Sequence, residues 1–212
     1  MKHRLTAFIA LTAAFTIGTA IADDGPKPDT DTTASNSAPR DFAPMTPSER
    51  FANFASHLAD PESVLRAAVS AGIKQASDNP KEWGGGAEAY GDRIGSAFAQ
   101  HVIQRSLMYG SSWALHEDNR YFVSGQSGFF RRVKYAVRST MLARHDDGHQ
   151  SLSFSRIGGT AGAAFISRIW QPRSDTSAGD GAVSFGINMG AEVGFNVFRE
   201  FWPDMVRRFH KK

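Results

Sequence analysis

The amino-acid sequence predicts an all-α protein, a single domain of about six helices with glycine-rich faces behind a signal peptide and a linker. Apolar residues recur three or four positions apart along most of the chain after residue 45, which is the spacing of one face of a helix. Capping residues mark two helix starts, and only one short segment alternates as a strand does. Periodicity and caps therefore decide the fold class.

The first 22 residues have the composition of a signal peptide. Lys2, His3 and Arg4 give a positive start, an apolar run covers 5–17, and Ala20 and Ala22 supply the small residues that signal peptidase recognises. The apolar run is too short to cross a bilayer, which argues against a retained anchor. We therefore expect cleavage after Ala22 and an exported protein, periplasmic or associated with the cell envelope.

Residues 23–45 predict a disordered linker, because they are rich in Pro, Ser, Thr and Asp and hold no large apolar residue before Phe42. The helical domain then covers 46–212. Loss of Lys2 and Arg4 with the signal lowers the basic residues from 24 to 22, against 21 acidic ones, so the net charge is +1. This balance and the export signal argue against a nucleic-acid partner. The chain has no cysteine, so it forms no disulfide.

Helices are expected in six places. Thr46 and Glu49 form a capping box with Pro47 at the first helical position, and Asp60 with Pro61 repeats this signal. Glycines and prolines separate the later helices. The expected ranges are 47–58, 61–77, 87–113, 128–142, 155–170 and 181–201, the last ending before Pro203, with a short basic helix closing the chain.

The periodicity also predicts which side chains face the core. Apolar residues of the first two helices fall on one face of each helix. They are Phe51, Phe54 and Leu58, then Val64, Leu65, Ala68, Val69 and Ile73. Residues 151–154 alternate, so a short hairpin around Asp147 and Gly148 is one alternative. A turn between helices is preferred, because no other segment of the domain supplies partner strands.

Small residues recur at every fourth position in three of the helices. The rows are Gly91, Gly95 and Ala99; Gly158 and Gly162; and Gly186, Gly190 and Gly194. Such a row lets another backbone approach closely, and each helical glycine costs about 0.5–1 kcal/mol relative to alanine, so something should touch it. Two interpretations stay open: packing of these helices within the monomer, or a homo-oligomer or membrane contact. The last row resembles the spacing of glycine-zipper segments.

Neither glycine-rich helix is predicted to span a membrane. Only 11 uncharged residues separate Arg156 from Arg168, and 11 separate Asp180 from Glu192, whereas a span needs about 20. Docking at a membrane surface stays open, with arginines reaching the headgroups from an apolar face. The residues concerned are Arg156, Arg168 and Arg199 with Phe165, Ile169, Trp170, Phe195, Phe198 and Trp202.

Two basic clusters remain after the signal is removed. They are Arg131, Arg132, Lys134 and Arg138 in the middle of the chain, and Arg207, Arg208, Lys211 and Lys212 at its end. We interpret them as solvated faces. The alternative is a contact with anionic lipid or with an envelope polymer.

Two clusters of polar residues are candidates for chemistry. His145, Asp146, Asp147 and His149 hold four potential metal ligands, but they lack the spacing of a helical zinc site, and Gly148 marks a turn. The segment from His116 to Arg120 lies beside aromatic residues and could house a general acid or base, although polar capping explains it more simply. His101 and Arg105 share a helix face with Phe98, so His101 is expected to be a hydrogen-bonded residue at the edge of the core.

The sequence therefore assigns no catalytic, cofactor-binding or metal-binding residue, and no cofactor is expected. The predicted function is that of an exported structural or interaction protein of the cell envelope. It would self-associate or bind a membrane surface through its glycine-row helices. The alternative is an enzyme or metal-binding protein that uses the segment His116–Arg120.

Overall fold

The structure is a computed structural model that describes residues 42–209. The predicted signal peptide, most of the predicted linker, and Lys211 and Lys212 lie outside these residues. Within them the protein is mainly helical, as predicted. The α-helices are α1 (Pro47–Ser56), α2 (Pro61–Ala76), α3 (Ala87–Ala114), α4 (Phe129–Met141), α5 (Phe154–Ile166) and α6 (Ala178–Phe209). Short 3-10 turns cover Lys81–Trp83, Ser167–Ile169 and Arg173–Asp175.

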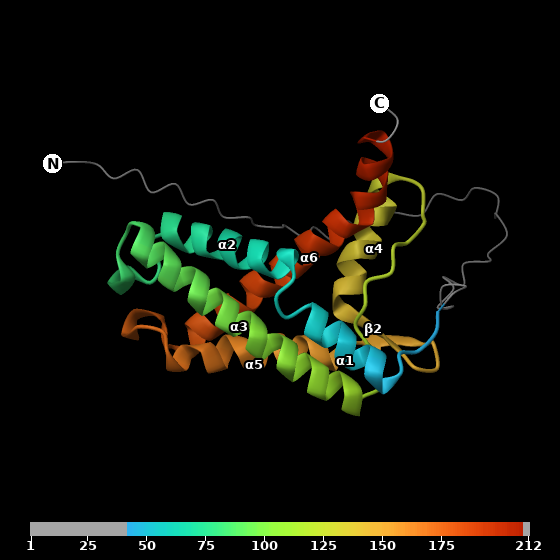
Figure 1. The fold of residues 1–212 in the computed structure, drawn as a ribbon, viewed down its shortest axis with the longest axis horizontal. Helices are drawn as coiled ribbons and strands as arrows, with labels where there is room; N and C mark the ends of the chain where they lie inside the picture. The colour runs from blue at the N-terminus through green and yellow to red at the C-terminus, as the bar shows by residue number, and fades with distance from the viewer. Residues whose placement is uncertain (1–41, 210–212) are drawn as a thin grey trace, which may run out of the picture. The chain divides into compact units, whose positions relative to one another are not determined.

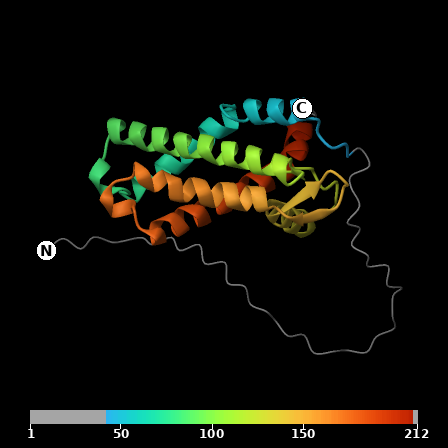
Figure 2. The ribbon, with the colours of Figure 1, turned by 90° about the horizontal axis from the view of Figure 1, so that it is seen from below.

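The long helix α3 organises the packing. It lies between α2 and α5 and also contacts α1, while α5 packs against α6 (Figure 1). Helix α4 packs against α6, beside the end of that helix (Figure 1). The view from below shows α3 and α5 running side by side along most of their length (Figure 2).

Both predicted helix starts have the expected caps. Glu49 N–H donates to Thr46 Oγ1 at 3.3 Å, and Thr46 N–H donates to the Glu49 carboxylate at 2.8 Å, which completes the capping box. Asp60 accepts a 2.7 Å hydrogen bond from the backbone N–H of Ser63. Local side-chain chemistry therefore fixes where α1 and α2 begin.

The all-α prediction missed a small antiparallel sheet. Strands β1 (Glu117–Asp118), β2 (Leu142–His145) and β3 (Gln150–Leu152) lie in that order, with Glu117 opposite His145 and Leu142 opposite Leu152. The preferred turn between helices was therefore wrong, and the hairpin alternative is correct. Gly148, at φ +88°, forms its turn. The partner strand β1 has two residues, too few to show an alternating pattern in the sequence.

The sixth helix was predicted to end before Pro203, but this prediction was wrong. The helix continues to Phe209 and changes direction toward its end (Figure 1). Arg132 of α4 binds both Glu200 and Asp204, which lie on either side of the proline. These contacts hold the two turns together where the proline removes a backbone donor.

Polar residues fill much of the interior, contrary to the predicted core. The largest completely buried side chains include Arg93, Glu117, Glu200, Asn196 and Thr140. The predicted core residues Phe51, Val64, Leu65, Val69 and Ile73 are instead about half exposed. Helix α2 turns its small residues inward, which allows it to lie close to α3. These small residues are Ser63, Ala67 and Ala71.

Of the glycines in the predicted rows, only Gly162 lies against another helix of the described part of the monomer. A Cβ placed on Gly162 would lie 2.7 Å from Leu107 of α3, and one on neighbouring Gly159 would lie 2.6 Å from Met108 Cγ. A Cβ at each other glycine of the rows would meet no atom of the described residues within 4 Å beyond its own helix and chain neighbours. Packing inside the monomer therefore does not explain Gly91, Gly95, Gly158, Gly186, Gly190 and Gly194.

Candidate functional site

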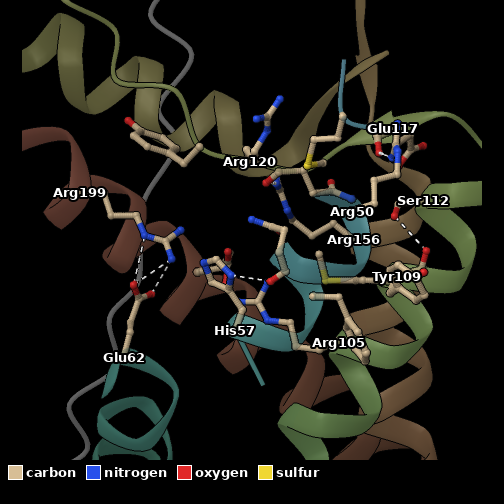
Figure 3. Close-up of a pocket in the computed structure, with 17 residues that line it drawn as sticks. Arg50, His57, Glu62, Arg105, Tyr109, Ser112, Glu117, Arg120, Arg156 and Arg199 are labelled. Atoms are coloured by element: carbon tan, nitrogen blue, oxygen red, sulfur yellow. Dashed lines mark hydrogen bonds and ion pairs between the residues drawn. The ribbon is translucent and has the colours of Figure 1, made fainter. Parts of the chain in front are cut away.

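A cavity of about 420 Å³ lies where α1, the start of α2, α3, α5 and α6 meet the segment that follows α3. We call it the arginine pocket, because five arginines from separate elements line it (Figure 3). They are Arg50, Arg105, Arg120, Arg156 and Arg199. Three carboxylates, of Glu62, Glu117 and Glu192, also line it.

Burial of the side chains distinguishes the floor of the pocket from its rim. Arg156 and Glu117 are 4% and 1% exposed and lie at the floor. The side chains of Arg120 and His57 are each 35% exposed. The pocket is thus polar at depth and reachable from solvent at its rim.

Three of the five arginines are paired with carboxylates. Arg199 binds Glu62 through both Nε and Nη2, at 2.8–3.2 Å. Arg120 binds Asp118 at 2.6 Å. Arg50 binds Asp146 at 2.6 Å and also donates to the backbone carbonyl of Glu117.

Arg66, just outside the pocket, bridges two of its carboxylates. Its guanidinium donates to Glu62 and to Glu192, each at 2.6 Å. Burial alone would raise the pKa of Glu192, but the charges of Arg66, Arg105 and Arg156 lower that pKa to about 2. Glu192 is therefore a permanent anion at neutral pH.

Glu117 is committed to the start of α5. Its carboxylate accepts hydrogen bonds from the backbone N–H groups of Phe154 and Ser155, at 3.0 Å each, and from two serine hydroxyls. The N-terminus of a helix carries partial positive charge, so α5 offsets much of this buried negative charge. Glu117 is thus held as a structural acceptor.

Arg156 and Arg105 have no carboxylate partner among residues 42–209. Arg156 donates to four backbone carbonyls, of Asn119, Ser139, Thr140 and Leu142, and its buried Nε has no acceptor there. Arg105 makes no hydrogen bond or ion pair with any described residue, and its Nε is also buried. Burial lowers the pKa of both arginines below the ordinary value, and nearby positive charges add to this effect.

The structure divides the predicted segment His116–Arg120. Glu117, Asn119 and Arg120 line the pocket, whereas the His116 side chain is 74% exposed and binds Asp146 at 3.0 Å. The expectation for His101 is confirmed, since its Nε2 lies 3.0 Å from the carbonyl oxygen of His57.

The second predicted cluster lies at the hairpin. His145 stacks on His149 at a centroid distance of 4.2 Å, and His149 binds Asp147. Within residues 42–209, no three His, Cys, Asp or Glu side chains are grouped as a metal site would need.

Sequence reasoning missed the pocket itself. Arg156 and Glu192 were noted as charges that bound uncharged stretches, and Arg156 also as a possible headgroup contact. A lone charge beside a long apolar run is nevertheless a usable signal of burial with a partner. Arg50 and Glu62 lie in the first turns of helices, where charged residues are ordinarily solvated. Nothing local distinguishes them.

The outer surface carries many large apolar side chains. The side chain of Ile169 is 83% exposed, and Phe165, Phe198 and Trp202 are about half exposed. Arg156 and Arg168 are buried and bound to internal carbonyl groups, so they do not reach outward from this surface, which corrects their predicted role as headgroup contacts.

One outward surface combines apolar and cationic side chains. We call it the basic–apolar face of α4, and its exposed residues fall on one side of that helix. They are Phe130, Arg131, Lys134, Val137, Arg138 and Met141. Phe130 is 84% exposed, and none of the three cations pairs with a carboxylate of the described part of the chain.

No family model, no curated protein and no solved structure matches this chain. No helix in the described range 42–209 is long and apolar enough to cross a membrane.

Proposed function

We propose that this chain is an exported envelope protein that acts by binding, and that it docks on an anionic membrane surface through the basic–apolar face of α4. The observation that carries the proposal is the pairing of an 84% exposed Phe130 with three cations that have no acidic partner in the described residues. Export itself is supported by the composition of residues 1–22.

The physical basis is the combination of two attractions. An aromatic side chain gains free energy when it enters the boundary between headgroups and acyl chains. Each Lys or Arg near an anionic leaflet adds about 1 kcal/mol. Such a surface suits Arg131, Lys134 and Arg138 better than a neutral or basic surface does.

Vesicle co-sedimentation tests this proposal. We expect the protein to bind vesicles of phosphatidylglycerol mixed with phosphatidylcholine and to bind pure phosphatidylcholine far more weakly. The K134Q/R138Q variant should lose about 30-fold in affinity for the anionic vesicles, the equivalent of two cations. The matched control K81Q/R173Q removes two exposed cations elsewhere and should bind as the parent does. Equal losses in both variants, or equal binding to neutral vesicles, would contradict the proposal.

Self-association through α6 is a second candidate. Gly186, Gly190 and Gly194 leave a smooth strip beside the exposed side chains of Val183 and Ile187, without a charged residue among them. Sedimentation without vesicles tests it: dimers in the parent that dissociate in Gly190→Leu would favour this candidate.

The alternative, an enzyme or metal-binding protein that uses the segment His116–Arg120, is less favoured. Glu117 and Arg120 line the arginine pocket, but the first is bonded to the start of α5 and the second to Asp118. These contacts favour ligand binding at the pocket over acid–base chemistry.

A further inference from the structure

Arg105 is a pocket residue that lacks a hydrogen-bond acceptor among the described residues, so a ligand could supply one. Its neighbours Arg50, Arg120 and Arg199 are each held by a carboxylate, whereas Arg105 has no acceptor within residues 42–209 and its Nε is buried. Buried polar groups without a partner are rare and costly, and a guanidinium is among the costliest. An anion in the pocket would supply the acceptor.

The charges around the pocket indicate how much negative charge is needed. The five lining arginines and Arg66 carry six positive charges, and the carboxylates that line the pocket or pair with these arginines number five. One of the five, Glu117, is already bound by donors at the start of α5. Since the N-terminus of α5 adds a partial positive charge of about +0.5, the excess is about 1 to 1.5 positive charges. A phosphate monoester carries about −1.5 to −2 at neutral pH, whereas a carboxylate carries −1.

The size and the apolar wall of the pocket point to an organic ligand. A volume of 420 Å³ equals the share of about 14 water molecules at roughly 30 Å³ each, so inorganic phosphate would fill only part of it. The lining includes the rings of Phe54 and Tyr109, stacked with their centroids 4.7 Å apart, and Met108. These side chains offer a surface for an apolar or cyclic group.

We propose that the arginine pocket binds a small organic phosphate monoester, with the phosphate against Arg105 and the organic group against Phe54 and Tyr109. Arginine suits this ligand because its planar fork of N–H groups matches the phosphate oxygens. Arg120 and His57 line the pocket with side chains that are each 35% exposed, so a ligand can reach the pocket from solvent. This site does not depend on membrane docking by α4.

Calorimetric titration with defined probes tests the proposal. Phenyl phosphate supplies both the dianion and a ring, inorganic phosphate the charge alone, succinate two carboxylates, and benzyl alcohol the ring alone. We expect phenyl phosphate to bind most tightly, inorganic phosphate at least tenfold more weakly, and benzyl alcohol not measurably. Tighter binding of succinate than of phenyl phosphate, or no binding of either phosphate at millimolar concentration, would overturn the proposal.

The variant R105M separates a ligand-binding role from a structural one. It removes a guanidinium that has no hydrogen-bond acceptor among residues 42–209 while keeping most of the side-chain volume, so the unfolding temperature of the unliganded protein should change little. Its affinity for phenyl phosphate should fall at least tenfold. The control R173M changes an exposed arginine and should bind as the parent does. A lower unfolding temperature with unchanged affinity in R105M would overturn the assignment.

The same titration distinguishes this site from the membrane proposal. The variant K134Q/R138Q should bind phenyl phosphate as the parent does, and R105M should bind anionic vesicles as the parent does. Loss of phenyl phosphate binding in K134Q/R138Q would place the phosphate on α4 and overturn the pocket assignment.

Discussion

Arg66 donates a 2.6 Å hydrogen bond to Glu192, and this ion pair joins α2 to the middle of α6 where both side chains are largely buried. Glu62 extends the contact, because it accepts from both Arg66 and Arg199. The contact between the two helices is therefore a row of alternating charges. Breaking one member leaves a buried charge without its partner, which is more costly than losing a surface pair.

The charge of Glu192 makes stability depend on pH in a defined direction. Its folded-state pKa of about 2 lies below the unfolded value of 4.5, so its contribution is present above pH 4.5 and is lost as the pH falls toward 2. We expect Glu192→Gln to lower the free energy of unfolding by about 3 kcal/mol at pH 7. The difference from the parent should shrink between pH 4.5 and pH 2. Urea unfolding at pH 7 and pH 3 measures both; a difference independent of pH would exclude this role.

Two glycine substitutions should have opposite signs. In Gly159→Ala the new methyl group would lie 2.6 Å from Met108 Cγ and near the backbone of α3, so we expect a loss of about 1–3 kcal/mol. In Gly190→Ala the methyl group meets open space, so better helix propensity should add up to about 1 kcal/mol. Thermal unfolding of the two variants checks this pair. Destabilisation by Gly190→Ala would show that another molecule covers the row.

The hairpin histidines should contribute modestly to stability. The sequence indicates a turn at Gly148, and replacing two solvated turn residues with alanine ordinarily changes stability by less than about 0.5 kcal/mol. The structure adds a ring stack between them and a 2.7 Å contact from His145 Nε2 to Ser151 Oγ, so we now expect about 1 kcal/mol. Chemical unfolding measures the change. Metal analysis of the purified protein checks the accompanying prediction that they bind no metal tightly, which one zinc per chain lost in the variant would disprove.

Export gives a prediction independent of the fold. The mature chain should begin at Asp23, because Ala20 and Ala22 form the only good cleavage pair. N-terminal sequencing of protein from the native host decides it. A chain that retains Met1 in the envelope fraction would refute cleavage.

The sequence was informative where short-range chemistry decides the structure. The capping residues Thr46 and Asp60 correctly predicted two helix starts, and the periodicity correctly predicted a helix in each of the six expected places. The prediction of the buried face of α2 was wrong. Periodicity places Val64 and Ile73 on one face and Ser63 and Ala67 on another, but it does not show which face contacts a neighbouring helix. That choice depends on α3, whose backbone accepts only small residues at short range.

The arginine pocket could not be predicted from short-range sequence patterns, because residues far apart in the chain form it. Arg50, Arg105 and Arg156 lie at least 51 residues from one another along the chain. No rule of sequence spacing connects the helices α1, α3 and α5 that carry them. Among the pocket residues, only the segment around Glu117 and Arg120 was considered as a possible site, because its charged and aromatic residues are adjacent in the chain. The packing of the helices brings the rest together.

A polar interior with apolar side chains outside also shapes the thermal behaviour of the protein. Hydration of apolar surface raises the heat capacity on unfolding, whereas hydration of polar surface lowers it. Unfolding here exposes Arg93, Glu117 and Glu200, while Ile169 and Phe130 already contact solvent. The heat-capacity increment should thus fall below the usual value of about 12–15 cal/mol/K per residue. A small increment flattens the stability curve, so the fold would hold a nearly constant free energy across a broad range of temperature.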